Sequence, residues 1–146
     1  MNFINFSRRD HFVITLQTIN MQYTKELMNH FANPHNQGQI NDADGIGEVG
    51  NIKCGDIMKI YIKVKKNDRG EEILEDVKFE TLGCAAAIAA SSALTDLAIG
   101  KTLDEAMKIS KEDIVAVFGE VPPIKLHCSI LAQEGLKKAI EEYRNN

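Results

Sequence analysis

The chain has 146 residues, of which 44% are hydrophobic and 26% charged, a length and balance typical of one globular domain with a single core. Its formal net charge of −4 at pH 7 offers no general attraction to nucleic acid or to anionic lipid. The aromatic content of 6%, with no Trp, provides no row of rings for base stacking. We therefore predict neither nucleic-acid nor membrane binding.

Three cysteines, Cys54, Cys84 and Cys128, form an odd and widely spaced set. Such a set is a poor framework for disulfides, so we expect reduced thiols and a cytoplasmic location. Reduced thiols are available for metal or sulfur chemistry.

Residues 1–20 differ in character from the rest of the chain. Arg8 and Arg9 precede a weakly apolar stretch that is too short for a secretory signal and lacks a small-residue cleavage site. A transit peptide, which would place the protein in the mitochondrial matrix, is a second interpretation, although the segment is poor in Arg and Ser. We favour a leader or non-native extension that is disordered, followed by one domain at residues 21–146.

The first predicted element is a helix in YTKELMNHFANP, residues 23–34. Thr24 is a cap-type residue and Pro34 would end the helix. Apolar residues recur between them at helical spacing: Leu27, Met28 and Phe31.

Two strands joined by the polar turn KNDRGEE follow. Residues 57–65 (IMKIYIKVK) alternate with period two, which is typical of a half-buried strand. The face predicted to be buried carries Met58, Ile60, Ile62 and Val64, and the opposite face carries Lys59, Tyr61, Lys63 and Lys65. ILEDVKFETLG, residues 73–83, alternates in the same way and predicts the second strand of an antiparallel hairpin. A third strand is expected at residues 47–52.

The Ala-rich stretch CAAAIAASSALTDLAIG, residues 84–100, predicts a helix that ends at Gly100. It is too short and too polar to span a membrane. Thr102 with Glu105 forms a capping-box pattern, and Ser110 with Asp113 opens another short helix. A last helix is expected at residues 129–143. Strands first and helices later predict an α+β fold: a three-stranded antiparallel sheet with helices packed on one side, in a single domain.

Each cysteine lies at the end of a predicted element. Cys54 stands between the first two strands with Asp56 two residues on, Cys84 opens the Ala-rich helix, and Cys128 follows His127 at the start of the last helix. A helix N-terminus favours the thiolate. Thiolates with an imidazole and a carboxylate could close a tetrahedral zinc site, or hold an iron–sulfur cluster with a non-Cys ligand, and the residue types alone do not choose.

Four stretches resemble the U-type iron–sulfur cluster assembly scaffolds, that is, the IscU family and the N-terminal domain of NifU. They occur in the family's order over residues 21–145: YTKELMNHFANPHNQG, GDIMKIYIKV, VKFETLGCAAAIAASSALTDLAIGKTLDEA and VPPIKLHCSILAQEGLKKAI. The resemblance implies that the metal ligands are Cys54, Asp56, Cys84, His127 and Cys128.

The resemblance implies a scaffold, not an enzyme. A [2Fe-2S] cluster would be assembled on it from iron and desulfurase-derived sulfur and then transferred to apo-proteins, and zinc could fill the cluster-free site. The implied partners are a cysteine desulfurase, a ferredoxin, a frataxin-like protein, a DnaK/DnaJ-class chaperone pair, apo iron–sulfur proteins, and a second copy of the chain with the cluster bound.

The segment before the last helix is expected to bind partners. Its prolines are expected to hold it extended and exposed, as a preformed ligand for a partner's groove. The exposed segment would leave Cys128 more reachable than Cys84, so Cys128 is predicted to receive sulfur first. The residues implied in partner binding are Tyr23, Val121, Pro122, Pro123, Ile124 and Lys125.

Two departures from the family pattern stand out. Ala85 and Ala86 follow the second cysteine, where family members usually carry Gly-Ser, and Val121 stands where they usually carry Leu. The cysteine pattern is also compatible with two other functions: a zinc-dependent sulfurtransferase of the SufU type and a structural zinc module. SufU-type proteins carry an insertion before the third cysteine and lack the adjacent His, so His127 and the compact stretch from Cys84 to Cys128 favour the scaffold.

Overall fold

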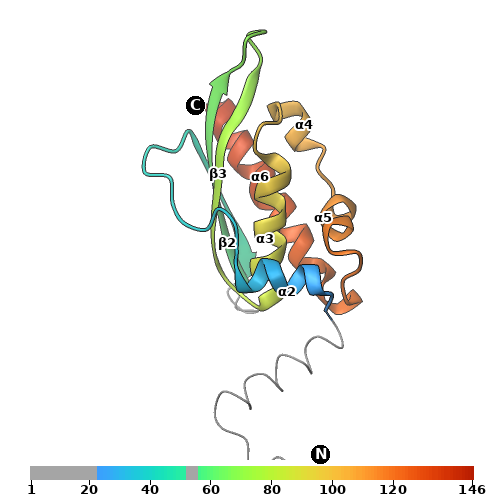
Figure 1. Cartoon of the computed structure of the whole chain (residues 1–146). Helices are drawn as coiled ribbons and strands as arrows, with labels where there is room; N and C mark the ends of the chain where they lie inside the picture. Colours follow the sequence, from blue (N-terminus) through green and yellow to red (C-terminus); the bar gives the residue numbers. More distant parts are fainter. Residues whose placement is uncertain (1–22, 52–55) are drawn as a thin grey trace, which may run out of the picture.

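The computed structural model describes residues 23–51 and 56–146, and within them it shows a three-stranded antiparallel sheet with helices on one face (Figure 1). The strands are β1 (Gly45–Asn51), β2 (Asp56–Lys66) and β3 (Glu72–Leu82), paired in the order β1-β2-β3. The predicted α+β fold class is therefore confirmed. Residues 1–20, Ile52 and Cys54 lie outside the described residues.

The alternation along β2 sets which side chains face the helices. Met58, Ile60 and Ile62 are at most 1% exposed, as predicted. Val64, which follows a shift in the β2–β3 register between Lys63 and Val64, is only half-buried. The prediction that the opposite face of β2 is solvent-facing is wrong at Tyr61, whose side chain is also buried. β2 is the central strand, and Tyr61 donates a hydrogen bond of 2.6 Å to Glu80 on β3.

The helices begin where the capping residues predict. Thr24 caps α2 (Lys25–Ala32), and capping boxes open α4 (Leu103–Met107) and α5 (Lys111–Phe118). The Ala-rich stretch forms α3 (Ala85–Ala98), and Gly100 after it has φ +88°, a conformation that a residue with a Cβ rarely adopts. The helical predictions for these segments are confirmed.

The last helix, α6 (Leu126–Asn145), begins three residues earlier than predicted and lies across the sheet. A single turn of 3₁₀ helix, η2 (Pro123–Lys125), leads directly into it. His127 and Cys128 therefore lie inside the first turn of α6 and not before it. The contact with β1 is close: a Cβ on Gly47 would lie 2.1 Å from the backbone oxygen of Gly135.

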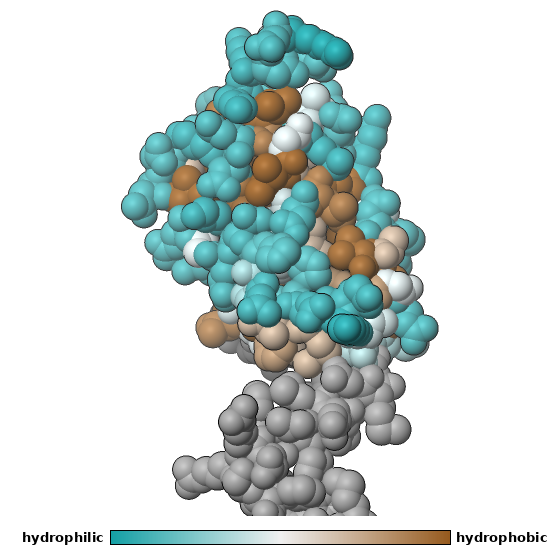
Figure 2. Space-filling model, in the orientation of Figure 1, coloured by the Kyte–Doolittle hydropathy of each residue, from teal (hydrophilic) through white to brown (hydrophobic). Residues whose placement is uncertain are grey.

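The starts of β2, α3 and α6 converge at one end of the molecule, which is the lower end in Figure 1. On the face shown in Figure 2, hydrophilic residues cover most of the surface, and hydrophobic residues emerge between them as separate patches. No helix among the residues described is long and apolar enough to cross a membrane.

Candidate metal centre

Cys84 is placed by the start of α3. It is the N-cap residue of that helix, and its carbonyl oxygen accepts hydrogen bonds from the N–H groups of Ala87 and Ile88. The hydrogen bond from Cys128 lowers the pKa of the Cys84 thiol to about 5, helped by the backbone N–H groups of Ala87 and Ala86 and by the charge of Lys125. Cys84 is therefore the thiolate of this site at neutral pH.

Cys128 lies directly behind Cys84. Its Sγ is 3.6 Å from the Sγ of Cys84, and its side chain is buried at 0% exposure. The hydrogen bond to Cys84 and burial both raise the pKa of the Cys128 thiol. The two cysteines thus share one proton, which Cys128 keeps and donates toward the Cys84 thiolate.

His127 and Asp56 continue the row of ligand atoms. Nδ1 of His127 lies 3.0 Å from the carbonyl oxygen of Ile124, which can only accept, so Nδ1 carries a proton. Nε2 lies 3.3 Å from Oδ2 of Asp56 and 3.6 Å from Sγ of Cys128. Nε2 thus faces both the carboxylate of Asp56 and the sulfur of Cys128, so that ring nitrogen links the two other ligand types.

Each pair of neighbouring atoms along this row is spaced like two ligands of one metal ion. Tetrahedral bonds of about 2.3 Å to sulfur and about 2.1 Å to nitrogen or oxygen separate two sulfurs by roughly 3.8 Å, sulfur from nitrogen by roughly 3.6 Å, and nitrogen from oxygen by roughly 3.3 Å. The Cys84–Cys128, Cys128–His127 and His127–Asp56 separations are 3.6, 3.6 and 3.3 Å. Two sulfurs, an imidazole and a carboxylate are donor types that iron and zinc accept, but no three of these four residues bring ligand atoms within 4.8 Å of one another, so the row supplies pairs of ligands and not a closed site for one ion. Four of the five predicted ligands lie together, and Cys54 lies outside the described residues.

Lys125 and Tyr23 flank the cysteines. The charge of the Cys84 thiolate raises the pKa of Lys125. Burial raises the pKa of Tyr23, whose hydroxyl also lies in the field of Lys125 and of both thiols. Tyr23 and Lys125, both predicted to bind partners, are thus coupled electrostatically to the two cysteines.

Two expectations about the segment from Val121 to Cys128 are wrong. The segment is not extended throughout, because Pro123–Lys125 forms the 3₁₀ turn. Pro123, Ile124 and His127 are exposed, and Val121, Pro122, Lys125 and Leu126 are half-buried. Cys128 is also not the more reachable thiol. Its position in the first turn of α6 points the sulfur into the core, whereas Cys84 at the N-cap of α3 is half-buried.

Two residues beside the cysteines were not found from the sequence. Gly83 leaves room for Asp56, because a Cβ at that position would lie 3.0 Å from the carboxylate oxygen Oδ1. Leu82 is 70% exposed and Ile124 is 76% exposed, the most exposed large apolar side chains in the described part of the chain. Leu82 could have been found from the sequence, because it is an apolar residue directly before the Gly83–Cys84 pair.

The fold and these side chains define an α+β protein with a candidate metal centre that combines two cysteines, an imidazole and a carboxylate. The family model described as the NifU-like N terminal domain matches residues 22–146. A structure of a nitrogen-fixing NifU-like protein (N-terminal) from Brucella abortus superposes with a TM-score of 0.67 at 19% identity, covering 88% of this chain and 98% of that one, which supports the fold.

Curated relatives agree with this match. The iron-sulfur cluster assembly scaffold protein IscU 1 of Archaeoglobus fulgidus is 51% identical over 121 residues, covering 83% of this chain and 76% of the relative. The protein IscU of Escherichia coli K12, described in the same words, is 46% identical over 128 residues, covering 86% and 96%. The chain therefore belongs to the U-type scaffold family of IscU and the NifU N-terminal domain.

Proposed function

We propose that this chain is a scaffold on which a [2Fe-2S] cluster is assembled and from which it is transferred to apo-proteins. The observation that carries the proposal is the row Asp56–His127–Cys128–Cys84, whose neighbouring atoms lie at metal-ligand separations. The names of the relatives, which are iron-sulfur cluster assembly scaffolds, support the same function. Cys54 is proposed as the third cysteine ligand, and the cluster is the cargo of the protein.

A mixed ligand set suits a scaffold that must release its cluster to another protein. A carboxylate or imidazole holds iron–sulfur centres less firmly than a further thiolate, so the Asp56 and His127 side of the row is where the cluster would be released. His127 is 51% exposed, so a recipient protein can reach that side.

Sulfur is proposed to come from a cysteine desulfurase. A scaffold thiolate attacks the outer sulfur of the desulfurase persulfide, a new S–S bond forms, and the desulfurase cysteine leaves as a thiolate. Reduction of that sulfur to sulfide takes two electrons, which the ferredoxin partner would supply. Cys128 was predicted as the acceptor, but its burial and raised pKa support Cys84 better.

The exposed side chains beside the metal centre are the proposed partner surface. Leu82 and Ile124 are apolar and exposed, and Lys125 and Tyr23 lie next to the cysteines. A desulfurase, a frataxin-like protein or a chaperone of the DnaK/DnaJ class would contact this surface, and a second copy of the chain could do so with the cluster bound.

Anaerobic reconstitution with iron and sulfide tests the proposal. We expect the absorption spectrum of a [2Fe-2S] cluster, and transfer of that cluster to an apo-ferredoxin. Cys54→Ser, Cys84→Ser and Cys128→Ser should each weaken the chromophore severely. A stable, full-strength chromophore in any of these variants would exclude that residue as a ligand.

The SufU-type alternative predicts a different result from the same sample. A zinc-dependent sulfurtransferase would hold Zn²⁺ as its working metal and would pass persulfide sulfur onward without forming a transferable cluster. Cluster transfer to apo-ferredoxin therefore separates the two functions, whereas zinc in a purified sample does not, because zinc readily fills an empty thiolate site.

A further inference from the structure

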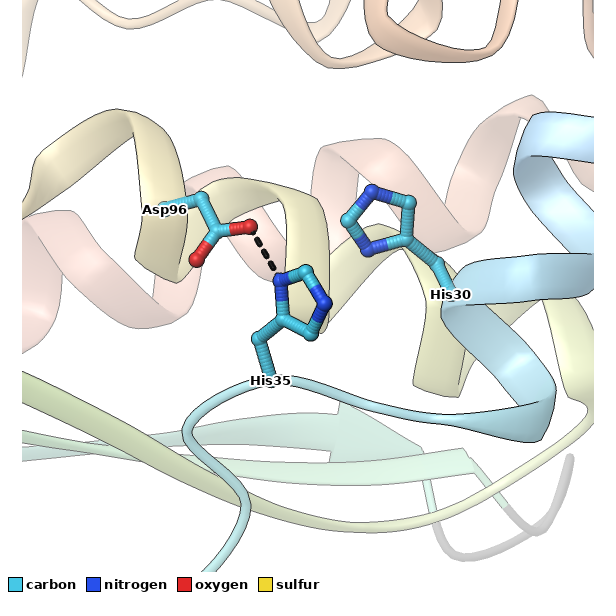
Figure 3. A group of neighbouring side chains, drawn as sticks. All are labelled: His30, His35 and Asp96. Atoms are coloured by element: carbon cyan, nitrogen blue, oxygen red, sulfur yellow. Dashed lines mark hydrogen bonds and ion pairs between the residues drawn. The ribbon is translucent and has the colours of Figure 1, made fainter.

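A second group of metal-ligating side chains lies outside the candidate metal centre. His30, His35 and Asp96 each bring one ligand atom, a ring nitrogen or a carboxylate oxygen, within 4.8 Å of the other two. Figure 3 shows the two imidazole rings side by side, with His35 and Asp96 pointing toward one another. We propose that these three residues form a binding site for a divalent transition-metal ion such as Zn²⁺, Fe²⁺ or Co²⁺.

Ser92 ties both histidines to α3, the helix that carries Asp96. Its Oγ forms a hydrogen bond of 2.8 Å with Nδ1 of His30 and accepts a hydrogen bond of 2.8 Å from the backbone N–H of His35. Ser92 is 0% exposed and lies four residues before Asp96, so its hydroxyl is a fixed point. One buried oxygen therefore positions two of the three ligands relative to the third.

Asp96 is oriented in its turn by Asn36. The side-chain amide of Asn36 donates hydrogen bonds to Oδ1 of Asp96 at 3.1 Å and to Oγ1 of Thr95 at 3.0 Å. The other oxygen, Oδ2, lies 2.5 Å from Nδ1 of His35. Supporting hydrogen bonds of this kind set the direction of a ligating carboxylate before an ion arrives.

Little movement is needed to seat an ion. Bonds of about 2.0–2.2 Å to nitrogen and oxygen place neighbouring ligand atoms roughly 3.3 Å apart. The side chains of His35 and Asp96 are 54% and 43% exposed, so they can turn toward an ion and leave positions open for water. Two imidazoles with one carboxylate select borderline transition metals over Mg²⁺ or Ca²⁺, which prefer oxygen ligands alone.

The proposed site is independent of the scaffold function, since it contains no sulfur and shares no residue with the metal centre. Its test uses the full chain labelled with ¹⁵N-histidine and titrated with Zn²⁺, while NMR follows the imidazole nitrogens. We expect the thiolate centre and His127 to respond first, and the rings of His30 and His35 to shift together as more Zn²⁺ is added. The four histidines are distinguished by single His→Gln variants.

Variants sharpen the result. His35→Gln and Asp96→Asn should each weaken this second binding by at least about tenfold and leave the response of His127 unchanged. Asp104→Asn is the matched control, because it removes an exposed carboxylate that pairs with Arg144 and should titrate like the parent protein. Co²⁺ adds a second readout: an ion at His30, His35 and Asp96 lacks the intense thiolate charge-transfer bands of an ion bound by cysteines.

The proposal is overturned if only His127 responds to Zn²⁺ in the parent protein, or if Asp96→Asn binds the second ion as the parent does. Circular dichroism verifies that each variant is folded. The spectrum of the parent protein decides the question even if a variant does not fold.

Discussion

Among single residues, Cys84 and Cys128 differ most from what their neighbouring sequence suggests. Both stand at helix N-termini, yet only the half-buried Cys84 has a lowered pKa, whereas the fully buried Cys128 keeps the shared proton. We expect iodoacetamide at pH 7 to alkylate Cys84 at least about ten times faster than Cys128 in the folded, metal-free protein, because the reagent needs an exposed thiolate. Mass spectrometry of the digested protein measures both rates.

Unfolding provides the control for this comparison. In concentrated urea the two cysteines lose their contact and their difference in burial, so their rates should converge. Equal rates in the folded protein would mean that Cys128 is exposed in solution, and would restore Cys128 as the first sulfur acceptor.

Asp56 is the second residue with a separable role. We propose that this carboxylate promotes release, because an oxygen ligand holds iron–sulfur centres less firmly than a thiolate and its contact of 3.3 Å with His127 places it at the end of the ligand row. We expect Asp56→Ala to hold its cluster longer than the parent and to pass it more slowly to an apo-ferredoxin. The decay of the cluster absorbance in air and the transfer rate measure the two effects.

Asp104→Asn, which changes an exposed carboxylate paired with Arg144, should behave like the parent. Faster cluster loss in Asp56→Ala would instead make Asp56 a required ligand.

Among the structural elements, α6 packs closely on β1 through the middle of the helix. A Cβ on Gly47 would lie 2.1 Å from the backbone oxygen of Gly135 and 2.5 Å from the backbone nitrogen of Ala139. Backbone atoms cannot turn aside as a flexible side chain can, so Gly47→Ala must push the helix away from the sheet. We expect a loss of about 3 kcal/mol in the free energy of unfolding, measured by urea denaturation.

Gly70→Ala is the matched comparison. Gly70 lies in the β2–β3 turn at φ +79° with nothing within 4 Å of an added Cβ, so only backbone strain opposes the substitution. That strain costs about 1 kcal/mol. If Gly47→Ala is no more destabilising than Gly70→Ala, the close approach of α6 to β1 does not exist in solution.

For the whole molecule, the metal centre joins three elements that are distant in sequence. Its ligands come from the start of β2, the N-cap of α3 and the first turn of α6, so a bound ion stabilises only the folded arrangement. We expect stoichiometric Zn²⁺ to raise the thermal midpoint by about 5–10 °C, since saturation at about 100 times the dissociation constant adds ~2.7 kcal/mol. Removal of the ion with a chelator should reverse the gain, as measured by calorimetry.

Cys84→Ser should lose this stabilisation, whereas Asp96→Asn should keep it, because Asp96 belongs to the separate histidine group. A gain that persists in Cys84→Ser would place the stabilising ion somewhere other than the cysteines.

Local sequence patterns determined most of the architecture. The period-two alternation of Met58, Ile60 and Ile62 specified which face of β2 is buried, because neighbouring side chains of a strand point to opposite faces. Thr24, Thr102 and Ser110 marked helix starts, because a side-chain oxygen satisfies N–H groups that the helix leaves free. The cysteine motifs, through their resemblance to a known family, indicated the ligands.

Contacts between distant segments were decided by the tertiary structure alone. The alternation along its strand predicts that Tyr61 faces outward, yet Tyr61 is buried because β2 is central in the sheet. The sequence predicts that Cys128 lies exposed at the start of a helix. It is buried because α6 begins at Leu126 and turns that sulfur into the core. His35 and Asp96 are 61 residues apart, and only the packing of α2 and the segment after it against α3 brings them together. Periodicity and capping describe one segment at a time, whereas burial and ligand distance depend on which segments meet.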